Sequence, residues 1–211
     1  MSESTQDLIH RLAQDAPPVR RLNPPLIRAG VWLAAIAILS GAAVAWLADV
    51  QMFVTRASDP RQTIELAATL ATGILAVVAS FEMSLPDRSR AWALLPTPSL
   101  ALWIATSGLG CFRSWVDGAP FDLVESSECF AFIVGMSLPL GFALLWMLRR
   151  AKPLAPMPVA AMGGLGVAGI AAFLLQFFHP FDVTVIDLVF HAVAVTLVVT
   201  VSARSNRVVA E

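Results

Sequence analysis

The sequence is poor in charged residues. Only 14% of its 211 residues are Asp, Glu, Lys or Arg, whereas 57% are hydrophobic and the mean hydropathy is +0.74. Soluble globular proteins carry about 25% charged residues. A chain of this size also has too much surface for its volume to bury so much apolar area in water. The composition therefore excludes a soluble enzyme and a disordered chain.

Cysteines, net charge and catalytic motifs are scarce as well. Two cysteines allow at most one intrachain disulfide, which excludes a secreted disulfide scaffold. A net charge of −1 provides no broad basic surface, so we expect no direct contact with nucleic acid. The chain has no P-loop, His-Glu-x-x-His, Gly-x-Ser-x-Gly or Cys-x-x-Cys motif, so an enzymatic function has little support. An integral membrane protein remains.

Long apolar runs are abundant. A helix that crosses a bilayer needs about 20 mostly apolar residues, and six runs of this length are present. The runs are continuously apolar rather than alternating, which favours helices over membrane strands. We predict an all-α integral membrane protein, a bundle of six transmembrane helices. The expected spans are Ala29–Ala48, Ile64–Ser84, Ala91–Cys111, Cys129–Leu148, Val159–Phe178 and Thr184–Ser202.

The distribution of basic residues predicts the orientation, because cytoplasmic loops carry an excess of Lys and Arg. Eleven of the 14 basic residues lie in the two termini and in the second and fourth loops, and only Arg56, Arg61 and Arg113 lie on the opposite side. Both termini are therefore predicted to be cytoplasmic. The expected parts are an N-terminal tail (1–28), a transmembrane domain (29–202) and a C-terminal tail (203–211).

Small residues recur at every fourth position of two predicted spans. Such stripes let helix backbones approach closely in lipid. Small residues are also common in membrane helices generally, and for either stripe alone this reading is equally good. The stripes are Ala68, Thr72, Ala76 and Ser80 in the second span and Ala160, Gly164, Ala168 and Ala172 in the fifth.

The N-terminal tail is the only predicted cytoplasmic segment that is long enough to bind a partner. Ser4 and Asp7 have the spacing of a capping box, and Leu8, Ile9 and Leu12 then form an apolar stripe at helical spacing. Prolines at positions 17 and 18 end the predicted helix. A helix of about ten residues is marginal alone in water, so it needs a partner's groove or the membrane surface. The alternative is a frayed leader with no function.

The two cysteines border an acidic loop on the external side. Cys111 ends the third span and Cys129 begins the fourth, so both face an oxidising compartment, where two cysteines that meet form a disulfide. His179 and Asp182 follow the fifth span on the same side. Two thiolates, an imidazole and a carboxylate suit a soft or borderline metal ion. The alternative is that each buried cysteine acts as a small hydrophobe.

The neighbours of Cys129 favour reactivity in one respect and oppose it in another. We expect Ser126 or Ser127 to cap the fourth span, which places Cys129 in the first turn, where helix amides stabilise a thiolate. Glu125 and Glu128 disfavour the thiolate, but they concentrate cations near it. Attack by a metal ion is therefore at least as well supported as oxidation by peroxide.

Other ionisable side chains receive structural predictions. Asp187 and His191 share one face of the sixth span, where they either form a proton relay or, as we favour, pair with each other. Glu65 and Glu82 lie near span ends, and we expect them to reach the lipid headgroups. His10 is expected to be solvated.

Several motifs together resemble the NrsF family, negative regulators of an extracytoplasmic-function sigma factor in proteobacteria. The first is the segment that leads into the first span, Asp-Ala-Pro-Pro-Val-Arg-Arg-Leu-Asn-Pro-Pro-Leu at positions 15–26. The order and spacing of the motifs, rather than any single one, carry the resemblance, which covers nearly the whole chain. The other motifs are Leu85–Arg90, Gly108–Cys111, Leu138–Pro139 and Leu144–Arg150.

The resemblance implies a six-span anti-sigma factor of the bacterial inner membrane. In that family the cytoplasmic N-terminal segment holds the sigma factor away from RNA polymerase, and external cysteines respond to heavy metals or oxidants. Cys111 and Cys129 match those positions, and some relatives carry a further cysteine near His179. No cofactor is implied beyond a transient soft metal ion at the cysteines. The expected sigma-binding residues are Leu8, Ile9, Arg11, Leu12, Arg20 and Arg21.

Two other classes compete with this interpretation. A membrane thiol oxidoreductase also uses external cysteines, but it needs a redox-active pair and a relay, and the lack of further cysteines argues against it. A small transporter is supported only by the intramembrane polarity of Asp187 and His191. The sequence does not indicate an oligomeric state.

Overall fold

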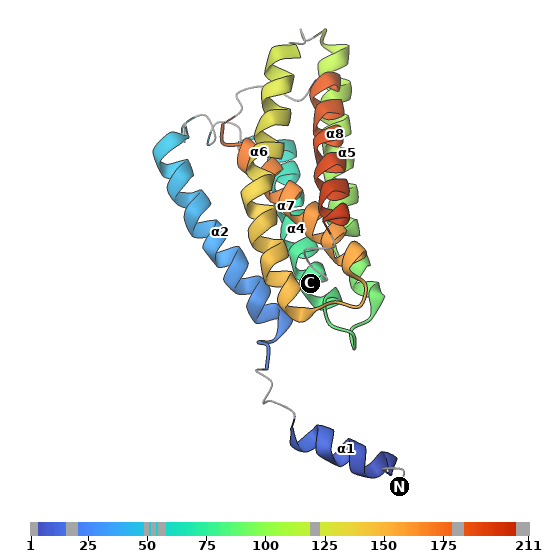
Figure 1. The fold of residues 1–211 in the computed structure, drawn as a ribbon. Coiled ribbons are helices and arrows are strands. Elements are labelled where there is room, and N and C mark those ends of the chain that lie inside the picture. The colour runs from blue at the N-terminus through green and yellow to red at the C-terminus, as the bar shows by residue number, and fades with distance from the viewer. Residues whose placement is uncertain are drawn as a thin grey trace.

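The computed structural model describes residues 4–15, 21–48, 51, 54, 58–118, 123–178 and 184–205. Every regular element in these residues is a helix (Figure 1). The helices are α1 (Thr5–Gln14), α2 (Pro25–Leu47), α4 (Pro60–Met83), α5 (Thr97–Val116), α6 (Leu123–Leu148), α7 (Pro156–Leu175) and α8 (Val185–Arg204), with two short 3-10 helices, η1 (Arg90–Leu94) and η2 (Arg149–Ala151).

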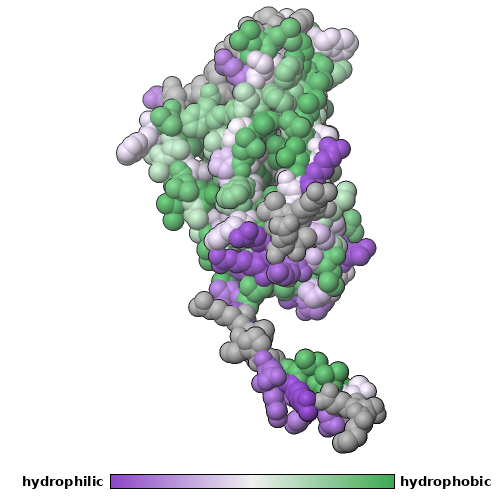
Figure 2. Space-filling view, in the orientation of Figure 1, coloured by the Kyte–Doolittle hydropathy of each residue, from purple (hydrophilic) through white to green (hydrophobic). Residues whose placement is uncertain are grey.

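Within the described residues, six helical segments are long and apolar enough to cross a membrane, which confirms the predicted bundle of six spans. On the face in Figure 2, apolar side chains cover the length of the bundle, and hydrophilic ones gather at the end where α2 begins. The third span departs most from its prediction, because η1 precedes it and α5 starts only at Thr97. Pro96 and Pro98 explain this start, since proline fits the first turn of a helix and interrupts a helix elsewhere.

Helices α4 and α7 form the centre of the bundle. They pack on each other, α5 packs on α4, and α6 and α8 pack on α7. Helix α2 is peripheral: its buried residues all lie in its first half, from Pro25 to Ile36. In Figure 1 it leans away from the other helices toward its C-terminal end. The chain therefore enters the bundle through a helix that is attached mainly at one end.

The backbones of α4 and α7 touch where they cross. A Cβ atom on Gly166 would lie 2.9 Å from the backbone nitrogen of Val77, and one on Gly169 would lie 3.0 Å from the Cα of Gly73. Only glycine permits this approach, which is typical of small-residue packing in membranes. All residues of the two predicted stripes are buried, as expected. The closest contacts, however, come from glycines that lie beside the stripes.

The bundle has two polar clusters at opposite ends. The Arg28 end lies where α2 begins and where α4 and α6 finish. Its residues are Arg28 and Trp32 of α2, Phe81 and Glu82 of α4, and Met147 of α6. The cysteine end lies where α5 finishes and α6 and α8 begin. It contains Cys111, Cys129 and two hydrogen-bonded pairs, Ser107–Glu65 and Ser126–Asp187. Helix α4 runs from the cysteine end to the Arg28 end.

Candidate functional site

Helix α1 presents an exposed apolar stripe. Leu8, Ile9 and Leu12 are 48%, 61% and 64% exposed, and none of the residues of α1 is buried. The predicted helix and its cap at Ser4 are confirmed, but Ser4 Oγ accepts from the backbone N–H of Gln6 rather than from that of Asp7. In Figure 1 α1 lies apart from the bundle. This stripe is therefore available to a partner.

The basic residues predicted to act with this stripe are only partly described. Arg11 lies in the last turn of α1 and is exposed, and Arg21 is exposed in the segment before α2. Arg20 lies outside the described residues. His10 is exposed on α1, in agreement with a solvated side chain.

Both cysteines are buried, and no disulfide joins them. Cys111 of α5 is 7% exposed and Cys129 of α6 is 1% exposed. Helix α8 packs against both α5 and α6. A reagent therefore reaches either thiol only after the helices at this end move apart.

The prediction that Cys129 lies in the first turn of its helix is wrong. Helix α6 begins at Leu123, so Cys129 lies in the second turn, beyond the reach of the exposed amides at the helix start. Neither predicted serine caps the helix at Cys129: Ser127 Oγ donates to the carbonyl of Val124, and Ser126 Oγ donates to a carboxylate on α8. Cys129 belongs to a cluster of buried apolar residues with Ile133, Ala171, Ala172, Leu175 and Ala194.

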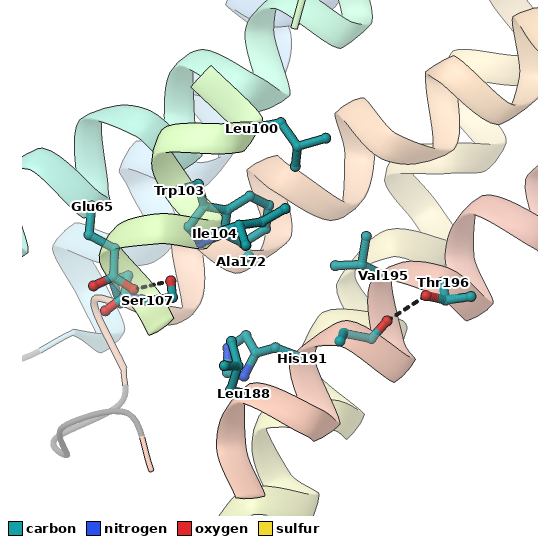
Figure 3. Close-up of a pocket in the computed structure, with 12 residues that line it drawn as sticks. Glu65, Leu100, Trp103, Ile104, Ser107, Ala172, Leu188, His191, Val195 and Thr196 are labelled. Atoms are coloured by element: carbon teal, nitrogen blue, oxygen red, sulfur yellow. Dashed lines mark hydrogen bonds between the residues drawn. The ribbon is translucent and has the colours of Figure 1, made fainter. Parts of the chain in front are cut away.

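Cys111 lies one helical turn from a hydrogen bond between α4 and α5. Ser107, four residues earlier on the same face of α5, donates its hydroxyl to Glu65 Oε1 at 2.6 Å (Figure 3). Arg61 Nη1 lies 3.2 Å from Glu65 Oε2, and Gly110 leaves the space that this guanidinium occupies. The prediction that Glu65 reaches the headgroups is wrong, because Ser107 and Arg61 hold its carboxylate inside the bundle.

Cys129 lies one turn from a second interhelical bond, between α6 and α8. Ser126 Oγ donates to Asp187 Oδ1 at 2.6 Å. Asp187 Oδ2 accepts from the N–H and the hydroxyl of Thr184 at 3.0 and 2.7 Å, which completes a capping box at the start of α8. His191 Nδ1 donates to the backbone carbonyl of Asp187 at 2.8 Å, so the favoured pairing of these two residues runs through the backbone and not the carboxylate.

The predicted metal ligands do not assemble within the described residues. No group of three or more His, Cys, Asp and Glu side chains converges there. Glu128 is exposed on α6. His179 and Asp182 lie outside the described residues, so the set of Cys111, Cys129 and His179 stays a prediction.

At the opposite end, a buried arginine ties the first span to the bundle. Arg28 donates from Nη2 to the carbonyl oxygen of Met147 on α6, and its guanidinium lies 5.0 Å from the ring centroid of Phe81 on α4. From the sequence, Arg28 counts only as one of the charges that set the orientation. An arginine at the first turn of an apolar span was the available signal, since buried arginine requires partners.

Glu82, next to Phe81 on α4, is 2% exposed and does not reach the headgroups, contrary to prediction. Its Oε2 lies 3.2 Å from Nε of Arg88, although the pair lacks hydrogen-bond geometry. Arg28 Nη1 and Trp32 Nε1 are likewise buried without a hydrogen-bond partner among the described residues. The polar groups at this end are thus only partly satisfied.

Comparison with protein families gives a match over nearly the whole chain. The model described as negative regulator of sigma F, NrsF, matches residues 12–210. The chain belongs to the NrsF family. Membership makes it a negative regulator with a sigma factor as its partner. Comparisons with curated proteins and with solved structures gave no match.

Proposed function

We propose that this protein is an anti-sigma factor of the bacterial inner membrane with both termini in the cytoplasm. It sequesters an extracytoplasmic-function sigma factor through its N-terminal segment. It releases that factor when a heavy metal or an oxidant modifies Cys111 or Cys129 from the periplasm. The observation that carries the proposal is the NrsF match over residues 12–210.

The exposed stripe of α1 supports the assignment of the sigma-binding surface. Leu8, Ile9 and Leu12 project from a helix that precedes the first span by about ten residues. An isolated helix of this length is marginal in water, so the docking of its apolar face into a groove of the partner stabilises both the helix and the complex. Because the family match begins at position 12, this surface is assigned from the geometry of α1 and not from the match.

The packing around the cysteines supports a sensing mechanism. Each thiol is buried one turn from an interhelical hydrogen bond, Ser107–Glu65 for Cys111 and Ser126–Asp187 for Cys129. Protein interiors are close-packed, so added volume forces helices to move. A metal ion or an oxidised sulfur at either thiol therefore separates α5 from α4 or α6 from α8 and strains that bond.

Helix α4 provides a physical route from the cysteines to the N-terminal segment. It carries Glu65 at the cysteine end and Phe81 at the Arg28 end, where Phe81 lies under the guanidinium of Arg28. Arg28 lies in the first turn of α2, directly after the N-terminal segment. Movement of α4 therefore changes how α2 is held. A shift from almost fully bound to almost fully free sigma factor requires about 5.5 kcal/mol of differential affinity between two packings.

Affinity capture of the full chain in mild detergent tests sigma binding directly. We expect a sigma factor to co-purify with the wild type, and Leu8→Asp to abolish its recovery because a carboxylate cannot enter an apolar groove. His10→Asp is the matched control, since it adds the same charge at an exposed position off the stripe. Unchanged recovery with Leu8→Asp contradicts the proposed surface, and absence of any sigma factor from the wild type contradicts the function.

Cysteine substitutions test the sensing step. We expect Cys129→Ser to retain repression of the sigma-dependent promoter and to lose induction by metals and oxidants, because serine keeps the packing but not the thiol chemistry. Ser127→Cys, an exposed position two residues away, serves as the control for a thiol outside the buried site. Normal induction in a Cys111→Ser, Cys129→Ser double variant excludes thiol sensing.

The orientation is tested with an impermeant thiol reagent on intact cells. In a background without native cysteines, we expect Asp117→Cys to be labelled and Thr5→Cys to be protected until the cells are lysed. Labelling of position 5 in intact cells reverses the topology and overturns the sensor-to-regulator mechanism.

A further inference from the structure

A cavity of about 230 Å³ lies among α4, α5, α7 and α8. Apolar side chains form most of its wall, and Figure 3 shows Trp103 and His191 on either side of it. Its rim includes Ile104, Ala192 and Thr196, which are exposed near the middle of α5 and α8. Because the middle of a membrane-spanning helix faces lipid, this mouth opens toward the hydrocarbon region and not toward water.

The size of the cavity suits one substituted aromatic ring. An engineered apolar cavity of about 150 Å³ holds benzene, and this cavity is larger. Trp103 offers a flat aromatic face on one side, and offset stacking on such a face stabilises a bound ring. A water-soluble peptide or folded partner does not reach the mouth, because the mouth lies at mid-span in the hydrocarbon region.

The hydrogen bonding of His191 determines which polar group the cavity accepts. A carbonyl oxygen only accepts, so the bond to Asp187 O places the proton on Nδ1. In the neutral ring Nε2 is then an acceptor, and it has no hydrogen-bond partner among the described residues. An unsatisfied acceptor in an apolar environment is costly. The vacant position therefore favours a ligand that donates a hydrogen bond.

The charge of the cavity selects a neutral ligand. Glu65 is the carboxylate on the wall, and Ser107 and Arg61 already engage its two oxygens. No unbalanced charge remains there to attract an ion. We propose that this cavity binds a lipid-soluble phenol, with the ring against Trp103 and the hydroxyl donated to His191 Nε2. This inference is independent of sigma binding and of thiol modification.

A matched pair of ligands tests the proposal on the purified full chain. The probes are 4-bromophenol and 4-bromoanisole, which share ring, bromine and apolar character but differ in the hydroxyl donor, and bromine quenches nearby tryptophan fluorescence. We expect saturable quenching by the phenol, with a Kd about fivefold lower than that of the anisole, the size expected for one net hydrogen bond. Trp103→Phe is expected to remove most of the saturable signal.

Two phenylalanine variants locate the binding site. Ala192→Phe narrows the mouth of this cavity, and we expect it to abolish saturable quenching. Gly141→Phe places the same side chain at a second cavity, between α6 and α8, where an added Cβ meets no atom within 4 Å. We expect this control to bind as the wild type does. Circular dichroism checks that both variants retain their helices.

The ligand pair on the wild-type protein decides the outcome even where a variant fails to fold. Equal, non-saturating quenching by both probes overturns the proposal and indicates simple partition into the membrane or detergent. Saturable but equal binding also overturns it, because the hydroxyl then contributes nothing. His191→Phe is expected to remove the preference for the phenol, and a preference that survives this change rejects His191 as the acceptor.

Discussion

The two ends of the bundle satisfy their buried polar groups to different degrees. At the cysteine end, both oxygens of Glu65 and both oxygens of Asp187 have partners on their own or neighbouring helices. At the Arg28 end, Arg28 Nη1, Trp32 Nε1 and Glu82 Oε2 are buried without a hydrogen-bond partner among the described residues. The carboxylates of the cysteine end are therefore fully paired. At the Arg28 end, two buried nitrogens lack an acceptor among the described residues, and Glu82 Oε2 has only the ion-pair contact with Arg88 at 3.2 Å.

This difference indicates which end rearranges more easily. A buried carboxylate that loses its partner is left with the full cost of desolvation, so the cysteine end resists opening. Buried groups at the Arg28 end that lack a hydrogen bond have less to lose when the helices shift, and new partners become available to them. The cysteine end is therefore expected to resist rearrangement, and the Arg28 end, which carries the N-terminal segment, is expected to rearrange more easily.

Arg61→Ala is expected to have the largest effect on stability. The substitution leaves Glu65 buried without its cation, and removal of one partner from a buried pair typically costs about 3 kcal/mol or more. The free energy of unfolding is measured by circular dichroism during titration from mild detergent into SDS. Arg113→Ala, which removes an exposed arginine from the same end, is expected to change it by less than about 0.5 kcal/mol. Equal losses of unfolding free energy in both variants contradict the claim that the Arg61–Glu65 pair stabilises the cysteine end.

Asp187→Asn is expected to lower the free energy of unfolding by about 2 kcal/mol. The amide keeps one acceptor for Ser126, but its NH₂ group cannot accept from the N–H and the hydroxyl of Thr184. The same titration measures the loss, with Asp117→Asn at an exposed position as the control. A loss no greater than that of the control shows that the capping box does not hold α8 in place.

Arg28→Met is expected to cost less, about 1 kcal/mol. It removes the bond to Met147 and the contact with Phe81. It also removes a buried nitrogen that has no hydrogen-bond partner in the described part of the chain, and apolar replacement of buried charge is often close to neutral. Arg21→Met at an exposed position is the control. A loss of unfolding free energy greater than that of Arg61→Ala would mean that the Arg28 end, and not the cysteine end, is the more strongly held.

Trp32→Phe is expected to have the smallest effect, below about 1 kcal/mol. The indole nitrogen has no hydrogen-bond partner among the described residues, so its removal loses only part of the packing of the ring. Thermal unfolding in detergent measures the difference, with Trp115→Phe, a 70% exposed ring, as the reference. A large loss indicates that Nε1 has a hydrogen-bond partner in the folded protein, which removes part of the contrast between the ends.

Local sequence was sufficient for much of the fold. The six spans follow from runs of apolar residues, and α1 follows from Ser4, the apolar stripe and the prolines after it. Errors arose where one residue type supports two roles. Pro96 and Pro98 lie inside an apolar run, yet they delay the start of α5, and Ser126 resembles a helix cap but bonds to α8 instead.

The amino-acid sequence by itself determined the number of spans, the amphipathic first helix and the family, because each depends on composition or on patterns within a few turns. Only the tertiary structure decided that α4 and α7 are central, that both thiols are buried, and that Glu65 and Asp187 are engaged. These properties join residues far apart in the chain: Ser107 lies 42 positions from Glu65, and Met147 lies 119 positions from Arg28. Hydropathy places a helix in the membrane, but close packing between side chains of different helices selects its neighbours.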